Sequence, residues 1–283
     1  MSVRSVARIV AAPEHQMGPL TIRQPLPSDE LPYLDPFVLL HHAPPRVSDG
    51  KHGLEAHPHR GFAPVSFIYK GAIRHRDTLQ NDSTITAGGV QWMHAGSGIL
   101  HEETPLAGEN ELIQLWINVP ARDKMKPPTY HPVSAEAMPR HLSDDGRITL
   151  NVVSGSLFGL SGPVPTLSPI NAAMIDARRN GRIEIPIPSS HNAFVYVLEG
   201  ALSAGASEPV DGFRLASFAR DGDAITLEAL EDTRALLMSG EPINEPIVTY
   251  GPFVMNTEEE IRKAFRDYRA GLFGEVAPLT ATA

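Results

Sequence analysis

Cysteine is absent from the 283 residues of this chain. Disulfides, thiolate metal ligands and cysteine nucleophiles are therefore excluded together, and a reducing, cytoplasmic setting is expected. Long apolar runs are also missing, since none approaches the ~18 residues of a membrane span. The opening residues, MSVRSVARIVAAPEHQ, lack the sustained apolar stretch of a secretory signal. We therefore expect a cytoplasmic protein that does not enter a membrane.

Basic residues are fewer than acidic ones, with 24 Lys and Arg against 33 Asp and Glu and a formal net charge of -9. Direct binding of nucleic acid usually needs clustered Lys and Arg, so we expect none here. Proline (26) and glycine (23) are plentiful, which favours many turns between short elements. The 12 histidines matter because a metal site without cysteine must use imidazole and carboxylate ligands.

Short runs rich in β-branched and aromatic residues recur along the chain, for example at 65–69, 112–117 and 194–198. Each run predicts a strand, and the chain as a whole predicts an all-β fold. Helical periodicity is limited to the C-terminal end, where Thr257 and Glu260 match a capping box. We expect one short helix there, packed on the second domain and ended by Gly271 or Gly274.

An internal repeat divides the chain. Residues 67–73, FIYKGAI, resemble residues 196–202, YVLEGAL, which suggests a duplicated domain. The polar run 134–145 is a linker candidate. We expect a first domain over residues 1–134 and a second over residues 135–283.

Two histidine motifs carry the most specific chemistry, His57-Pro58-His59 and His101-Glu102-Glu103. Residues i and i+2 of a strand project from the same face, so each motif presents two ligands to one side. A lone His-x-His is more often a surface or packing pair. Two such motifs on neighbouring strands favour a metal site, and six-coordinate metals would keep positions open for water or substrate.

The blocks HPHRGF, GAIRHRD and QWMHAGSGILHEE resemble the signatures of the pirin family in the cupin superfamily. Residues 34–37 and 244–256 resemble pirin blocks as well. This resemblance implies two cupin-type β-barrel (jelly-roll) domains. It implies one divalent transition metal in the first domain, with iron(II) favoured and nickel, copper, manganese or zinc left open. The implied ligands are His57, His59, His101 and Glu103.

Two departures from the general cupin pattern are visible. The glutamate that often follows His-x-His is missing, because Gly61, Phe62 and Ala63 occupy that region, and the resemblance to pirins implies that Glu103 replaces it. The repeat places Pro186 and Pro188 where the first domain has His57 and His59. We therefore expect no metal in the second domain.

Two functions are open at this point. Several pirins are described as quercetin 2,3-dioxygenases, so the resemblance implies ring cleavage of a flavonol by dioxygen. Glu103 would then be the catalytic base that takes the 3-hydroxyl proton. Other pirins are nuclear transcription cofactors or regulators, which implies a metal-dependent protein that binds a protein partner without catalysis.

Four further side chains are interpreted from their positions. Glu102 should face away from the ligands and be solvated or paired. Arg60 should anchor its loop through charge-assisted hydrogen bonds. His75 could support the pocket or simply pack in the core. Trp116 could line an apolar mouth or belong to the core.

Overall fold

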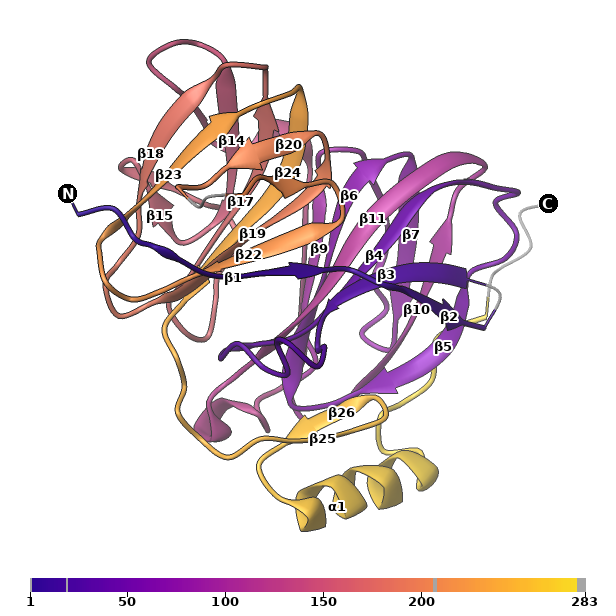
Figure 1. Cartoon of the computed structure of the whole chain (residues 1–283). Coiled ribbons are helices and arrows are strands. Elements are labelled where there is room, and N and C mark those ends of the chain that lie inside the picture. The colour runs from indigo at the N-terminus through magenta and orange to yellow at the C-terminus, as the bar shows by residue number, and fades with distance from the viewer. Residues whose placement is uncertain (1, 19, 206–207, 279–283) are drawn as a thin grey trace. The chain divides into compact units, whose positions relative to one another are not determined.

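The computed structural model describes residues 2–18, 20–205 and 208–278 (Figure 1). Strands make up 55% of the chain and α1 (Glu258–Arg269) is its α-helix, which confirms the all-β prediction. Backbone contacts divide the chain into two compact units. Unit 1 comprises residues 1–42 and 135–243, and unit 2 comprises residues 43–134 and 244–283. Among the described residues, no helix is both long and apolar enough to cross a bilayer.

The units differ from the contiguous domains expected from the sequence. One crossing between units falls at 134/135, where the boundary was expected, but the first 42 residues group with the later half. The reason is strand pairing, because β1 (Val6–Ala11) pairs with β22 (Arg214–Phe218). The paired residues are more than 200 positions apart, so local sequence patterns do not reveal this pairing.

Unit 2 contains the four-stranded antiparallel sheet β5-β10-β7-β8 and the run β12-β9-β6-β11, which is part of a seven-stranded antiparallel sheet. β4 (Phe37–Ser48) leads into it from unit 1, and the short 3-10 turn η1 (Ala121–Asp123) follows β11. The strands are β5 (Leu54–His59), β6 (Phe62–Lys70), β7 (Ala72–Asp77), β8 (Asp82–Thr86), β9 (Val90–His94), β10 (Ile99–Pro105), β11 (Gly108–Asn118) and β12 (Thr129–Val133).

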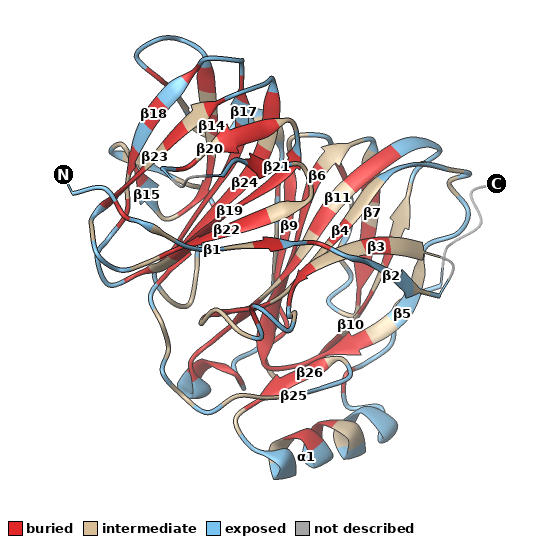
Figure 2. Cartoon of the chain, in the orientation of Figure 1, coloured by how far each residue is buried: buried red, intermediate tan, exposed pale blue. Residues whose placement is uncertain are grey.

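Unit 1 contains two larger antiparallel sheets, in the orders β1-β22-β19-β24-β17-β14-β13 and β18-β23-β20-β21, and the two-stranded sheet β15-β16. Its core is aliphatic, and Figure 2 shows buried residues along β19 and β24. The remaining elements are β2 (Glu14–Met17), β3 (Leu20–Leu26), η2 (Ala135–Ala137), β13 (Arg140–Leu142), β14 (Ile148–Ser154), β15 (Ser156–Leu157), β16 (Leu160–Ser161), β17 (Ile170–Ala177), β18 (Arg182–Pro186), β19 (Asn192–Glu199), β20 (Ala201–Ser203), β21 (Val210–Asp211), β23 (Ala224–Ala229) and β24 (Thr233–Gly240).

The sequence repeat corresponds to the same strand–glycine–strand element in each unit. Gly71 joins β6 to β7 with φ 73°, and Gly200 joins β19 to β20 with φ 82°, values that favour glycine. The correspondence extends to the ligand-bearing strand. Pro186 pairs with Ala224, whereas His57 pairs with His101. Pro186 and Ala224, the corresponding pair in unit 1, therefore offer no metal-ligating side chain.

The C-terminal segment belongs to unit 2. The hairpin of β25 (Val248–Tyr250) and β26 (Phe253–Met255) precedes α1, whose Thr257 and Glu260 form the predicted capping box. The helix ends at Arg269, shortly before Gly271, which has φ 73°. Ile261 and Ala264 of the helix share a buried hydrophobic cluster with Phe253 and Met255 of β26, all within unit 2. The helix therefore closes the unit that carries the histidine motifs, and not the domain expected from the sequence.

Candidate metal centre

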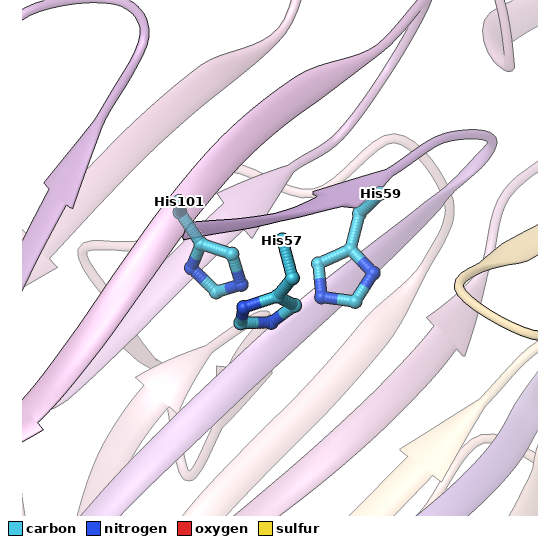
Figure 3. A group of neighbouring side chains, drawn as sticks. All are labelled: His57, His59 and His101. Atoms are coloured by element: carbon cyan, nitrogen blue, oxygen red, sulfur yellow. The ribbon is translucent and has the colours of Figure 1, made fainter. Parts of the chain in front are cut away.

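Three imidazoles meet inside unit 2. His57 and His59 lie on β5, and His101 lies opposite His57 on the neighbouring strand β10. One nitrogen from each ring lies within 4.8 Å of the other two, and Figure 3 shows the three rings turned toward one another. His59 and His101 are buried and His57 is half-buried. The i, i+2 spacing therefore brings His57 and His59 to one point, where His101 of the neighbouring strand meets them.

The hydrogen bonds of these rings leave their Nε2 atoms available. His57 donates from Nδ1 to the carbonyl oxygen of Glu55 at 2.8 Å, and His59 donates from Nδ1 to that of Pro252 at 3.2 Å. A carbonyl can only accept, so in the neutral form of either ring the lone pair is on Nε2. Nε2 of His59 and Nε2 of His101 are buried and have no hydrogen-bond partner among the described residues.

Burying an imidazole nitrogen without a hydrogen-bond partner costs free energy. A bound transition-metal ion would remove this cost by coordinating Nε2 of both His59 and His101. Burial, assisted by the nearby His57, lowers the pKa of His59 to about 3. Burial also holds the pKa of His101 well below its usual value, with smaller contributions from His59 and His57. Both rings are therefore uncharged at neutral pH, which is the form that binds a metal. The residues present fit a metal ion.

Glu103 lies two residues after His101 on β10 and is buried. Its Oε1 accepts a hydrogen bond from the Ser66 hydroxyl at 2.8 Å, and its Oε2 accepts one from Nε2 of Gln114 at 2.9 Å. The three imidazoles form the group of converging ligand atoms, whereas this carboxylate is bound by β6 and β11. Its role as a fourth ligand therefore stays a prediction.

An aromatic cluster lies beside the histidines. The Trp116 ring centroid lies 4.4 Å from that of Phe62 and 5.4 Å from that of His59. Phe37 packs on Phe194 in unit 1 and does not belong to this cluster. Phe62 was not predicted to line the pocket, although it lies three residues after His59 of the first motif.

The turn after β5 is held in place by hydrogen bonds and by close backbone packing. Arg60 donates from Nη1 to Asp267 of α1 at 2.8 Å and from Nε to the carbonyl of Ser97 at 2.7 Å, which confirms its predicted anchoring role. Gly61 has φ 84°, and a Cβ there would lie 2.2 Å from the carbonyl oxygen of Val254. These contacts fix the end of β5, and with it the position of His59.

A buried lysine crosses the same region. Lys124 donates from Nζ to the carbonyl oxygens of Gly61 at 2.7 Å and Val254 at 3.0 Å, and to Oδ1 of Asn118 at 2.6 Å. Burial lowers its pKa to about 8. This side chain joins the turn after β5 to β11 and β26, so its role is structural.

Glu102 on β10 and His75 on β7 lie close to His101 but have different partners. Glu102 pairs with Arg76 at 2.5 Å, as expected for a side chain on the opposite face from the histidines. His75 contacts His101, with 3.4 Å between their Nδ1 atoms. Asp77, which binds His75, was missed, although its i, i+2 spacing on the same strand was visible.

Comparison with known proteins agrees with this architecture. The Pirin family model matches residues 20–117, and the Pirin C-terminal cupin domain model matches residues 172–274. A pirin-like protein of Caulobacter vibrioides is 36% identical over 280 residues, covering 96% of this chain and 100% of that protein.

Solved structures share the fold over most of the chain. A quercetin 2,3-dioxygenase from Acinetobacter baumannii is 34% identical with a TM-score of 0.91, covering 98% of this chain and 100% of that one. A bacterial pirin from Escherichia coli in complex with nickel(II) is 18% identical with a TM-score of 0.66, covering 83% and 99%, and shows likeness of fold alone. The two matched cupin domains confirm the predicted bicupin fold, and this chain belongs to the pirin family.

Proposed function

We propose that this chain is a metal-dependent dioxygenase that cleaves the ring of a flavonol such as quercetin. The observation that carries the proposal is the convergence of three imidazoles, two of them with buried and unpartnered Nε2 atoms. The sequence likeness to a solved quercetin 2,3-dioxygenase supports this choice of reaction. The substrates would be a small aromatic molecule and dioxygen.

His57, His59 and His101 would hold the metal through Nε2, and Glu103 would provide a fourth, oxygen ligand. Imidazole and carboxylate together suit iron(II), which we favour, and also nickel, copper, manganese or zinc. A bound ion would polarise the flavonol oxygen that reaches it and so lower the cost of deprotonation. With four protein ligands, a six-coordinate ion keeps room for substrate.

Glu103 would act as the general base that removes the 3-hydroxyl proton. Ser66 and Gln114 each donate to one of its oxygens, so the carboxylate is oriented before a substrate arrives. Each carboxylate oxygen has a second lone pair, which leaves capacity to accept the proton. Phe62 and Trp116 would offer flat apolar surfaces to a planar substrate.

Loss of flavonol absorbance and uptake of dioxygen by the metal-loaded protein test this proposal. His59→Ala should abolish both signals, and Glu103→Gln should reduce turnover strongly. The matched control is His52→Ala, because His52 is exposed and pairs only with Asp49 in its own loop. Wild-type protein that is fully loaded with iron yet inert would contradict the proposal. That result would favour a regulatory protein that binds a protein partner.

A further inference from the structure

His75 connects the candidate metal centre to a buried carboxylate. It lies on β7, which pairs with β10, and its Nδ1 lies 3.4 Å from Nδ1 of His101. Its other nitrogen, Nε2, lies 3.0 Å from Oδ2 of Asp77. All three side chains are at most 2% exposed. They form a continuous chain of contacts that is almost completely shielded from solvent.

The carboxylate of Asp77 is the fixed end of this chain. Oδ1 accepts from the backbone nitrogens of Leu79 at 2.8 Å and Asn81 at 3.1 Å, and Oδ2 accepts from Nδ2 of Asn81 at 2.8 Å. Burial alone would raise its pKa, but the hydrogen bonds from His75 and Asn81 outweigh this and lower it. Asp77 is therefore ionised and can only accept hydrogen bonds.

The proton positions on His75 and His101 can be deduced in order, starting from Asp77. Because both oxygens of Asp77 already accept from N–H groups, the proton of its hydrogen bond with His75 is on Nε2 of His75, and in the neutral form of that ring the lone pair is on Nδ1. This lone pair accepts the Nδ1 proton of His101. The lone pair of His101 is then on Nε2, the atom that is buried without a partner. In the opposite tautomer, a proton would occupy Nε2 and exclude a metal ion.

Ring orientation is also fixed. The Tyr130 ring stacks on His75 with centroids 3.9 Å apart and an interplanar angle of 6°. The Tyr130 hydroxyl is itself 2.8 Å from the hydroxyl of Ser83 on β8. His75 therefore presents Nδ1 to His101 in one defined direction.

We propose that His75 and Asp77 are positioning residues that hold His101 in the tautomer and orientation needed for metal binding. The inference rests on the metal site proposed above. A carboxylate or carbonyl usually orients a metal-bound histidine directly, and loss of such a partner commonly costs 10–100-fold in affinity. Here the partner of His101 is a second imidazole, which relays the constraint from the carboxylate.

Substitutions at His75 separate positioning from packing. His75→Phe keeps a ring stacked on Tyr130 but removes the acceptor for His101. His75→Asn leaves a small void, yet its Oδ1 can occupy the position of Nδ1 and accept that proton. His42→Phe is the matched control, since His42 is a fully buried imidazole of unit 1 bonded to Tyr196.

Nickel(II) titration of each metal-free protein measures the effect, with thermal unfolding recorded beside it. We expect His75→Phe to bind nickel about 10–100-fold more weakly than wild type. His75→Asn should stay closer to wild type in affinity even if it unfolds at a lower temperature. His42→Phe should bind as wild type does. Equal loss of affinity in His75→Phe and His75→Asn would overturn the proposal, because it would indicate packing alone.

Nitrogen-15 NMR of the imidazoles in the metal-free protein provides an independent test. We expect His101 to carry its proton on Nδ1 in wild type and to populate the other tautomer in His75→Phe. A wild-type protein that does not bind nickel would refute the metal site, while the tautomer measurement would still decide the relay. An unchanged tautomer and affinity in His75→Phe would overturn the relay itself.

Discussion

The Ser66 hydroxyl donates a 2.8 Å hydrogen bond to Oε1 of Glu103, which connects β6 to β10 across the interior of unit 2. Gln114, opposite Ser66 on β11, donates to the other oxygen of the same carboxylate. A side chain held from both oxygens has little freedom to rotate. The orientation of the Glu103 carboxylate is therefore set by the sheet opposite its own.

Ser66→Ala should slow flavonol turnover about 10-fold, because hydrogen bonds to charged groups contribute roughly 1.5–3 kcal/mol and orient the acceptor. Nickel affinity should change much less, since the three imidazoles are untouched. Steady-state turnover and nickel titration of the same preparations measure the two effects. Ser239→Ala, which removes a hydroxyl bonded to His191 in unit 1, is the control. Unchanged turnover in Ser66→Ala would show that Glu103 needs no such support.

Metal removal should destabilise the protein. A ligand that binds only the folded state at 1,000 times its Kd adds about 4 kcal/mol of stability. Calorimetry with and without a chelator should therefore show a lower unfolding temperature for the metal-free protein. In His59→Ala the chelator should make no difference. A chelator effect that persists in this variant would place the bound metal elsewhere.

The metal-free protein should lose stability as pH falls below about 6.5. Burial lowers the pKa of His59 to about 3, and it also lowers the pKa of His101. As pH falls below about 6.5, the unfolded chain therefore binds more protons than the folded one, and each of the two groups costs up to about 1.4 kcal/mol of stability per pH unit. The stabilisation is complete above the unfolded pKa and is lost as pH falls toward the folded pKa.

Urea unfolding of the metal-free protein at pH 7, 6 and 5 measures this slope. His59→Phe should show a shallower dependence on pH, because one of the two neutral imidazoles is gone. Equal slopes in wild type and variant would mean that His59 titrates normally in the folded protein.

Gly61→Ala should destabilise the protein by more than about 2 kcal/mol, because strain at positive φ adds to a Cβ placed 2.2 Å from Val254 O. It should also weaken nickel binding by displacing His59. Gly159→Ala is a close control, since Gly159 has φ 75° with nothing within 4 Å of the added Cβ, and only the backbone strain of about 1 kcal/mol should remain. Chemical denaturation and nickel titration of both variants check this. Similar losses in both would assign the effect to φ alone.

Local patterns in the sequence were sufficient for several features. The His57–His59 spacing predicted one side of the histidine cluster because strand side chains alternate with a period of two. The capping box at Thr257 predicted where α1 begins, since both of its hydrogen bonds are local. The likeness of residues 67–73 to residues 196–202 predicted a duplicated domain, because similar local sequences form the same strand–glycine–strand element.

Only the tertiary structure decided which segments share a unit and what surrounds the cluster. Residues 1–42 join the later half through the pairing of β1 with β22, and the contacts of Ser66 with Glu103 and of His75 with His101 join different strands. The sequence by itself determined the residue types, their alternation and the turns, which are properties of near neighbours. Strand order and the meeting of sheet faces depend on pairing between distant residues, and such pairing is selected by the packing of the whole core.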